Sequence, residues 1–194
     1  MEYMESKEKI ISFYSANQLS VNGLYNFLHN LNIIYNRLYT LKFFPESVGK
    51  NPINTLNNSL YYVPFEHQLK IHKIELSSPG QIDVLGIASI IKEARELIKD
   101  RYRNKIERDQ GMANIKKTNA ETENIITDTE LKRLEVIKAS VDILKSLGHS
   151  DSEIREIMDN KISTPRNKLL KAMEENDISL VEPENTDVKP EKEK

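Results

Sequence analysis

One stretch, residues 68–147, decides what this chain can fold into, because a strand pattern gives way there to a helical one. It begins as QLKIHKIEL, turns at Ser77-Ser78-Pro79-Gly80, and from Ile82 places apolar residues at helical spacing. An unbroken helix from Ile82 to Leu147 would be about 100 Å long at the α-helical rise. Such a helix cannot bury its apolar stripe against a small domain of its own. We expect it to pair with another chain; the alternative is that it folds back at Gly111.

The helical part of this stretch contains a candidate oligomerisation seam. Its apolar residues step by three, four and three, which is the spacing of a coiled-coil heptad. These residues are Leu134, Ile137, Val141 and Leu144. We predict that they join copies of the chain into a homo-oligomer.

The distribution of aromatic residues divides the chain. All five Phe and seven of the eight Tyr lie in residues 1–67, and Lys, Glu, Ile and Leu dominate after residue 68. Large aromatic side chains are typical of a sheet or a tight globule, and the later composition is typical of long helices. The predicted parts are an α+β cap (1–98), a long charged helix or coiled coil (99–147), a short helical hairpin (148–175) and a disordered acidic tail (176–194).

The cap has the pattern of a small α+β domain. Strands are predicted at 9–15, 59–63 and 68–76, the last with a bulge near His72-Lys73. An amphipathic helix capped by Ser20 or Asn22 follows the first strand, and a second helix starts at Ile82. The order strand, helix, strand, strand, helix predicts a ferredoxin-like fold whose last strand is missing or supplied by another chain. Gly86 is predicted to be a packing glycine where another backbone comes close.

Signals for helix ends divide the region after residue 147. Gly148 is predicted to end the long helix, and Ser150 and Glu153 form a capping box for the next one. Thr164 followed by Pro165 opens a further helix. These lengths are also compatible with a helix-turn-helix, whose last helix would carry Arg166, Lys168 and Lys171.

No residue set predicts a catalytic, cofactor or metal site. The chain has no cysteine, which excludes disulfides, Cys-ligated zinc and thiol catalysis. His67 and His72 are five residues apart on a strand pattern, so they point to opposite faces and do not share a metal. Phosphate-binding loops, nucleophile elbows and zinc-protease motifs are also missing. We therefore expect a protein that is not an enzyme and needs no cofactor.

One basic segment keeps a nucleic-acid role open. The net charge is −2, so no overall basic bias draws the chain to nucleic acid or anionic lipid. Cations nevertheless gather on the long helix, and a solvated charged face is their more common role. The candidate nucleic-acid contacts are Lys99, Arg101, Arg103, Lys105 and Arg108.

The sequence favours a soluble, cytoplasmic protein. Its first residues, MEYMESKEKI, carry both charge signs with no apolar run behind them, so no signal peptide is expected. The apolar stretch IDVLGIASII is about half the length that spans a bilayer. The lack of cysteine fits a reducing compartment.

The stretch Leu69–Ile98, LKIHKIELSSPGQIDVLGIASIIKEARELI, followed by a charged helix, resembles a group of bacterial proteins related to the N-terminal domain of the death-receptor adaptor TRADD. The resemblance implies a ferredoxin-like domain for protein–protein assembly in anti-phage or self-limiting conflict systems. We expect no fused effector domain from these residues, so that role would require a partner. The predicted function is a non-enzymatic interaction and oligomerisation module that binds itself and an unidentified protein. The alternative is a dimeric nucleic-acid-binding regulator.

Overall fold

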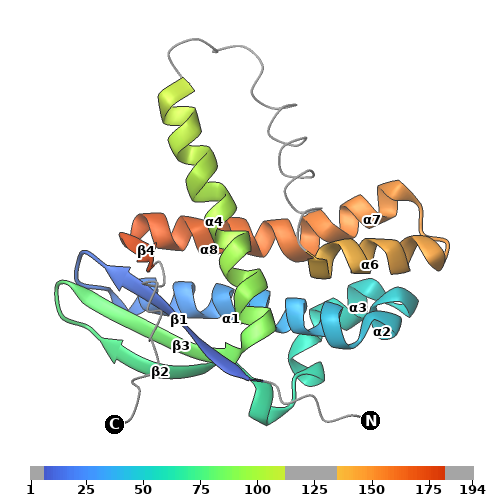
Figure 1. The fold of residues 1–194 in the computed structure, drawn as a ribbon, viewed down its shortest axis with the longest axis horizontal. Coiled ribbons are helices and arrows are strands. Elements are labelled where there is room, and N and C mark those ends of the chain that lie inside the picture. The colour runs from blue at the N-terminus through green and yellow to red at the C-terminus, as the bar shows by residue number, and fades with distance from the viewer. Residues whose placement is uncertain (1–6, 112–134, 182–194) are drawn as a thin grey trace, which may run out of the picture.

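The protein combines helices with one antiparallel sheet, as predicted for the α+β class. The computed structural model describes residues 7–111 and 135–181. In these residues four strands are ordered β2-β3-β1-β4 (Figure 1). The strands are β1 (Glu8–Ser15), β2 (Lys70–Glu75), β3 (Gly80–Ile87) and β4 (Ile178–Leu180). The predicted bulge in β2 is confirmed, because its register with β3 shifts between Ile71 and Lys73.

The helices follow the predicted caps at several ends. Ser20 caps α1, its side chain accepting a hydrogen bond from the Gly23 N–H. The capping box of Ser150 and Glu153 is present, and its hydrogen bonds lower the pKa of the Glu153 carboxyl. The helical elements are α1 (Val21–Phe43), α2 (Pro45–Lys50), α3 (Pro52–Asn57), η1 (Ser59–Tyr62), η2 (Phe65–His67), α4 (Ala88–Gly111), α6 (Glu135–Ser146), α7 (Asp151–Met158), η3 (Asp159–Ser163) and α8 (Thr164–Glu175).

The core lies where α1 packs on the sheet and on the C-terminal helices. Phe13 of β1 contacts Phe27 of α1 edge-on, with ring centroids 4.8 Å apart. Ile82 of β3 is fully buried, and so is Leu169 of α8. Burying apolar surface from these distant segments in one place is the main source of stability here.

The segment from Ile82, predicted as a helix, is instead strand β3. It pairs with β1 on one side and β2 on the other, and is therefore a central strand. A strand buried on both faces has a continuous apolar run, which does not alternate and is easily read as a helix. Gly86 is confirmed as a packing glycine, although on a strand and against a side chain rather than a backbone. A Cβ added there would lie 2.7 Å from Tyr35 Cε2.

The predicted strand at 59–63 is also wrong. These residues form the 3₁₀ turn η1, in which the Tyr61 N–H bonds the Asn58 carbonyl. Leu60 and Tyr61 are both exposed. Consecutive exposed residues leave no apolar face for a sheet to bury, so the β-forming composition of this segment does not decide its structure.

The structure describes the predicted long helix in two parts, α4 before residue 112 and α6 after residue 134. The backbone of α4 is described to Gly111, and its outer half stands away from the other elements (Figure 1). Residues 112–134 lie outside the described part, and α6 then returns to pack on α1 and α2. His149, just after α6, bonds the Gly49 carbonyl of α2 through Nε2 at 3.0 Å. α6 therefore packs on its own chain, as the alternative of a chain that folds back requires, while a break at Gly111 itself stays a prediction because the residues after it lie outside the described part.

The region after residue 148 is part of the same body as the cap. The Arg37 guanidinium of α1 donates to the Lys161 carbonyl at 2.6 Å, and Arg166 Nε donates to the Leu97 carbonyl at 3.0 Å. The predicted disordered tail starts too early, because residues 178–180 form β4 on the free side of β1. The fourth strand is thus supplied by this chain.

Candidate interaction site

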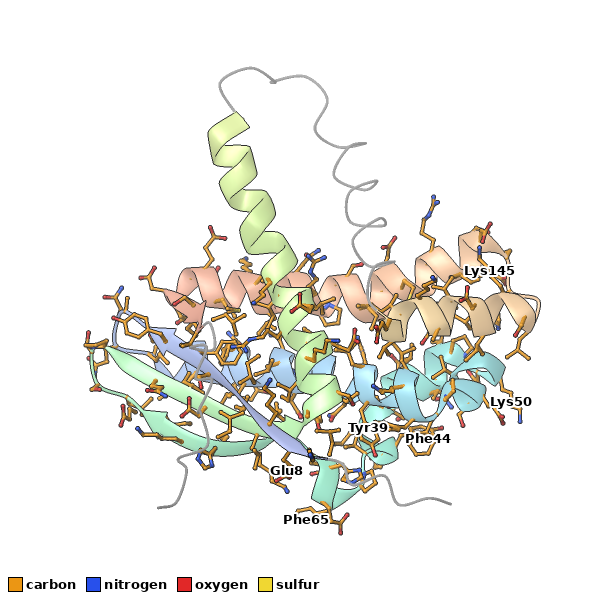
Figure 2. All side chains as sticks on the ribbon, in the orientation of Figure 1. Glu8, Tyr39, Phe44, Lys50, Phe65 and Lys145 are labelled. Carbon is orange, nitrogen blue, oxygen red and sulfur yellow. The ribbon has the colours of Figure 1, made fainter. Side chains whose placement is uncertain are left out.

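Aromatic side chains gather where the end of α1 meets residues 59–67. Tyr39 lies at the centre, with ring centroids 4.5 Å from Phe43, 6.4 Å from Phe44 and 5.8 Å from His67. Phe44 in turn lies 5.3 Å from Tyr62, centroid to centroid. We name these five residues, with the exposed Tyr61 and Phe65 of residues 59–67, the aromatic corner. Figure 2 labels Tyr39, Phe44 and Phe65 of this group.

Hydrogen bonds anchor the corner to the sheet. The buried Tyr35 hydroxyl donates to the His67 carbonyl at 2.7 Å and accepts from the Ile87 N–H at 2.9 Å. The Tyr39 hydroxyl lies 2.7 Å from His67 Nδ1. Burial raises the pKa of Tyr35 to about 12 and also raises that of Tyr39. Both phenols are therefore neutral hydrogen-bonding groups at ordinary pH.

Prolines interrupt the two segments that carry the exposed rings of the corner. Phe44 directly precedes Pro45, which starts α2, and Pro64 separates η1 from η2. Each proline fixes its own φ and lacks an N–H, so it cannot continue a helix that precedes it. Tyr61, three residues before Pro64, is 86% exposed, and Phe65, directly after it, is 79% exposed.

The corner has the composition of a binding surface for protein. Large aromatic residues dominate the energetics of interfaces, because each buries much area with little loss of rotamer freedom. Exposed charges of both signs adjoin it in sequence, at Lys42, Glu46 and Glu66. An apolar centre with a charged rim is the usual arrangement of a specific interface.

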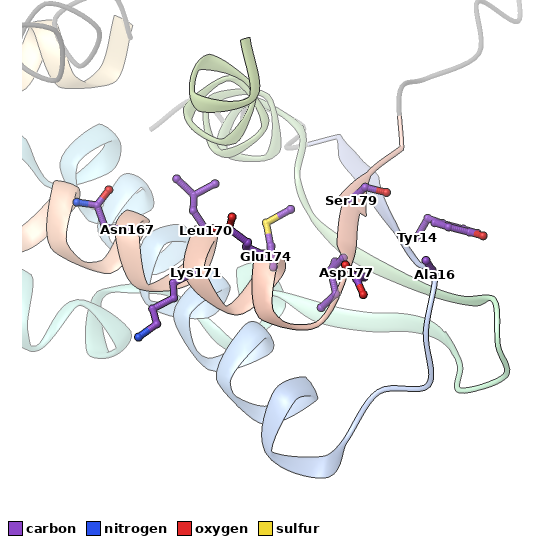
Figure 3. A pocket seen from close by; sticks show the side chains of 10 residues that line it. Tyr14, Ala16, Asn167, Leu170, Lys171, Glu174, Asp177 and Ser179 are labelled. Carbon is purple, nitrogen blue, oxygen red and sulfur yellow. The ribbon is translucent and has the colours of Figure 1, made fainter. Parts of the chain in front are cut away.

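A second surface feature is an open groove of about 770 Å³ beside α8 and β4 (Figure 3). Leu170 and Met173 contribute apolar surface, while Lys171, Glu174 and Asp177 contribute charges of both signs. Asp177 adopts a left-handed backbone with φ of 49°, which turns the chain from α8 into β4. This mixture does not select one ligand chemistry, so the groove carries no functional conclusion.

The predicted oligomerisation residues do not share one environment in the structure. Ile137 and Leu144 are each 1% exposed and belong to the core of the single chain. Val141 is half-buried against that core, and Leu134 lies outside the described residues. The fold thus uses this apolar stripe internally.

The predicted nucleic-acid contacts lie along α4. Lys99 is half-buried and has an interaction partner. The side chains of Arg101, Arg103, Lys105 and Arg108 lie outside the described residues, so this prediction stays a prediction.

Acidic and imidazole groups do not gather into a metal site within the described ranges 7–111 and 135–181. One buried carboxylate has an unusual environment. Glu93 on α4 is 5% exposed, and its Oε2 has no hydrogen-bond partner. Burial raises its pKa, as does the nearby Glu135, whereas Lys42 and Lys92 lower it.

The aromatic corner was not predicted from the sequence, because the Phe and Tyr residues of 1–67 were all expected in a buried core. A usable signal was present. Phe43-Phe44 precede Pro45, and Tyr61-Tyr62 and Phe65 flank Pro64, so these rings lie beside helix-breaking residues, where a regular element that would bury them ends.

Family models, curated proteins and solved structures contain no match to this chain. Among the described residues, no helix combines the length and apolar character needed to cross a membrane.

Proposed function

We propose that this chain is a non-enzymatic protein–protein interaction module that binds a partner protein through the aromatic corner. The observation that carries the proposal is the exposure of Tyr61 and Phe65 on the segment whose Tyr62 and His67 pack against Phe44 and Tyr39. Aromatic side chains are enriched at interfaces between proteins. The hydrogen bonds of Tyr35 fix the segment, so binding costs little ordering of the backbone.

The scaffold for this surface is proposed to be ferredoxin-like. Two features support that fold: the antiparallel strand order β4-β1-β3-β2, and the chain order strand, helix, two strands, helix, with a last strand from the C-terminal segment. The helices α6, α7 and α8 lie between α4 and the last strand.

The biological setting we propose is that of an adaptor in a bacterial anti-phage or conflict system. It rests on the resemblance of residues 69–98 to relatives of the TRADD N-terminal domain. An adaptor of this kind links other proteins, which accords with a surface built for binding rather than for chemistry.

Site-specific photo-crosslinking tests the corner. A photo-reactive phenylalanine at position 61 or 65 is expected to trap one defined protein in cells. The matched control places the same residue at Lys168, which is exposed on α8. Tyr61→Ser with Phe65→Ser should then reduce binding of the purified partner by at least about tenfold, since aromatic hot spots contribute about 2 kcal/mol or more each. Equal adducts at all three positions would contradict the proposal.

A second candidate is a dimeric nucleic-acid-binding regulator, favoured by the position of α4. Its outer half stands away from the body, and residues 99–108 contain five cations against two acids. Binding to duplex DNA that weakens steeply with salt, and is lost in Arg101→Ala with Arg103→Ala, would support this candidate.

A further inference from the structure

The outer edge of β2 is open to pairing. Within the described residues β2 pairs only with β3, so its other edge has no neighbouring strand. Ile71 on this strand is 57% exposed, and Leu76 just beyond it is 53% exposed. An exposed edge with apolar side chains is a template for another strand.

The hydrogen-bonding phase of the sheet shows which residues of β2 face outward. The Ala88 N–H donates to the Lys7 carbonyl at 2.8 Å, in register with the β1–β3 ladder. Even-numbered residues of β3 therefore bond β1, and odd-numbered residues bond β2, since backbone groups alternate between the two sides. Lys70, Lys73 and Glu75 are opposite odd-numbered residues of β3. The backbone N–H and C=O of Ile71 and Ile74 consequently point to the open edge.

The bulge makes this edge self-complementary. Residues three apart on a regular strand lie on opposite faces, but Ile71 and Ile74 are opposite Val84 and Ile82, on one face, because His72 is the extra residue. When the segment KIHKIE (70–75) is aligned antiparallel with a copy of itself, Lys70 lies opposite Glu75 and Ile71 lies opposite Ile74. Both members of each pair share a face, as directly opposed residues in an antiparallel pair must.

We infer that β2 pairs with β2 of a second copy of this chain, antiparallel, about a two-fold axis at His72-Lys73. Ile71 then exchanges its backbone hydrogen bonds with Ile74 of the partner subunit, and Lys70 lies opposite Glu75 of the partner subunit. The two sheets become one continuous sheet. This interface is separate from the aromatic corner and does not depend on the function proposed for that corner.

Edge lysines and bulges often prevent such pairing, so the charges decide the outcome. Lys70 now bonds Glu8 at 2.8 Å, and Lys73 bonds Glu75 at 2.7 Å, in exposed ion pairs. Exposed pairs of this kind contribute little and are readily exchanged. In the symmetric pairing each Lys70 gains an opposite charge rather than a like one, and Ile71 is covered by an apolar neighbour.

The first test removes one outward donor. The full chain is expected to be dimeric by light scattering at high protein concentration and to dissociate on dilution. Ile71→Pro deletes an N–H that β3 does not use, so it should weaken the dimer by at least about tenfold and leave thermal unfolding of the monomer nearly unchanged. Ile71→Thr, which keeps the N–H, is the matched control and should still dimerise.

The second test exchanges charges. Glu75→Lys places like charges opposite each other twice, and should raise the dimer dissociation constant by about tenfold. Lys70→Glu combined with Glu75→Lys should restore it, although the double variant loses the ion pair with Glu8 within the chain. A wild-type monomer up to about 1 mM, or a dimer that Ile71→Pro and Glu75→Lys do not weaken, would overturn the inference.

Discussion

Glu93 shows how one residue can make stability depend on pH. Its carboxylate is buried on α4 with Oε2 unpartnered, and burial raises its pKa above the value in the unfolded chain. Ionisation therefore costs nothing below the unfolded pKa. The cost grows as the pH rises towards the folded pKa and is constant above it.

Glu93→Gln should therefore stabilise the protein by about 1 kcal/mol near pH 8 and change it little near pH 4, because it removes a buried unpaired charge. Urea unfolding at both pH values measures the difference. Glu156→Gln, the same exchange at an exposed position of α7, is the control. An equal gain at both pH values would mean that packing, not charge, is responsible.

Gly86 sets how closely α1 approaches the sheet. A Cβ at this position would meet the Tyr35 ring at 2.7 Å, and Tyr35 cannot withdraw easily because its hydroxyl bonds both His67 and Ile87. Gly86→Ala should cost about 1–3 kcal/mol through overpacking, as measured by urea unfolding. Gly148→Ala is a useful comparison, since that glycine has φ of 90° and open space around it. Its cost should come from backbone strain alone, about 1 kcal/mol. A neutral Gly86→Ala would show that the close approach is not needed.

At the scale of elements, β4 lies within the segment that was predicted to be a disordered acidic tail. Ile178 is buried beside Ser15, and the Val181 N–H donates to the Ser12 carbonyl at 2.9 Å. A chain ending at Asn176 should lose about 2 kcal/mol or more, because it uncovers an apolar site and the edge of β1. A chain ending at Val181 keeps these contacts and is the matched control. Thermal unfolding that is equal for both truncations would refute a structural role for β4.

The elements that the sequence predicted correctly carry strong local signals. The stripe from Leu24 to Leu41 repeats at helical spacing, and Ser20 and Ser150 cap as expected.

The wrong predictions have a common physical cause, which is that tertiary contacts decided the structure. Segment 80–87 became a strand because β1 and β2 flank it, and residues 178–180 did so because β1 offered an open edge. Local pattern predicted β1 and β2 as strands, but it does not show which segments pair with them. The aromatic corner was hidden for a related reason, because composition counts rings without showing which are exposed.

At the scale of the whole molecule, the structure is organised by α1, which touches the sheet, α4, α6 and α8. This arrangement uses most apolar stripes within one chain. The aromatic corner and the β2 edge are the two surfaces that we propose for binding proteins. If β2 pairs as inferred, each particle carries two aromatic corners. Two linked sites bind a repeated partner more tightly than either site alone, without any new contact.

The predicted seam and the observed fold lead to different expected results for Ile137→Asp. In a seam between chains, Ile137→Asp would separate subunits that remain folded. In this structure Ile137 lies in the core, so the charge should instead destabilise the single chain by about 3 kcal/mol or more. Val141→Asp, at a half-buried position on the same helix, should cost less. Urea unfolding with light scattering on the same samples separates the cases. If the Ile137→Asp subunits separate while the unfolding midpoint is unchanged, the predicted seam between chains is supported. If the midpoint falls, and falls more for Ile137→Asp than for Val141→Asp, α6 belongs to the core of its own chain.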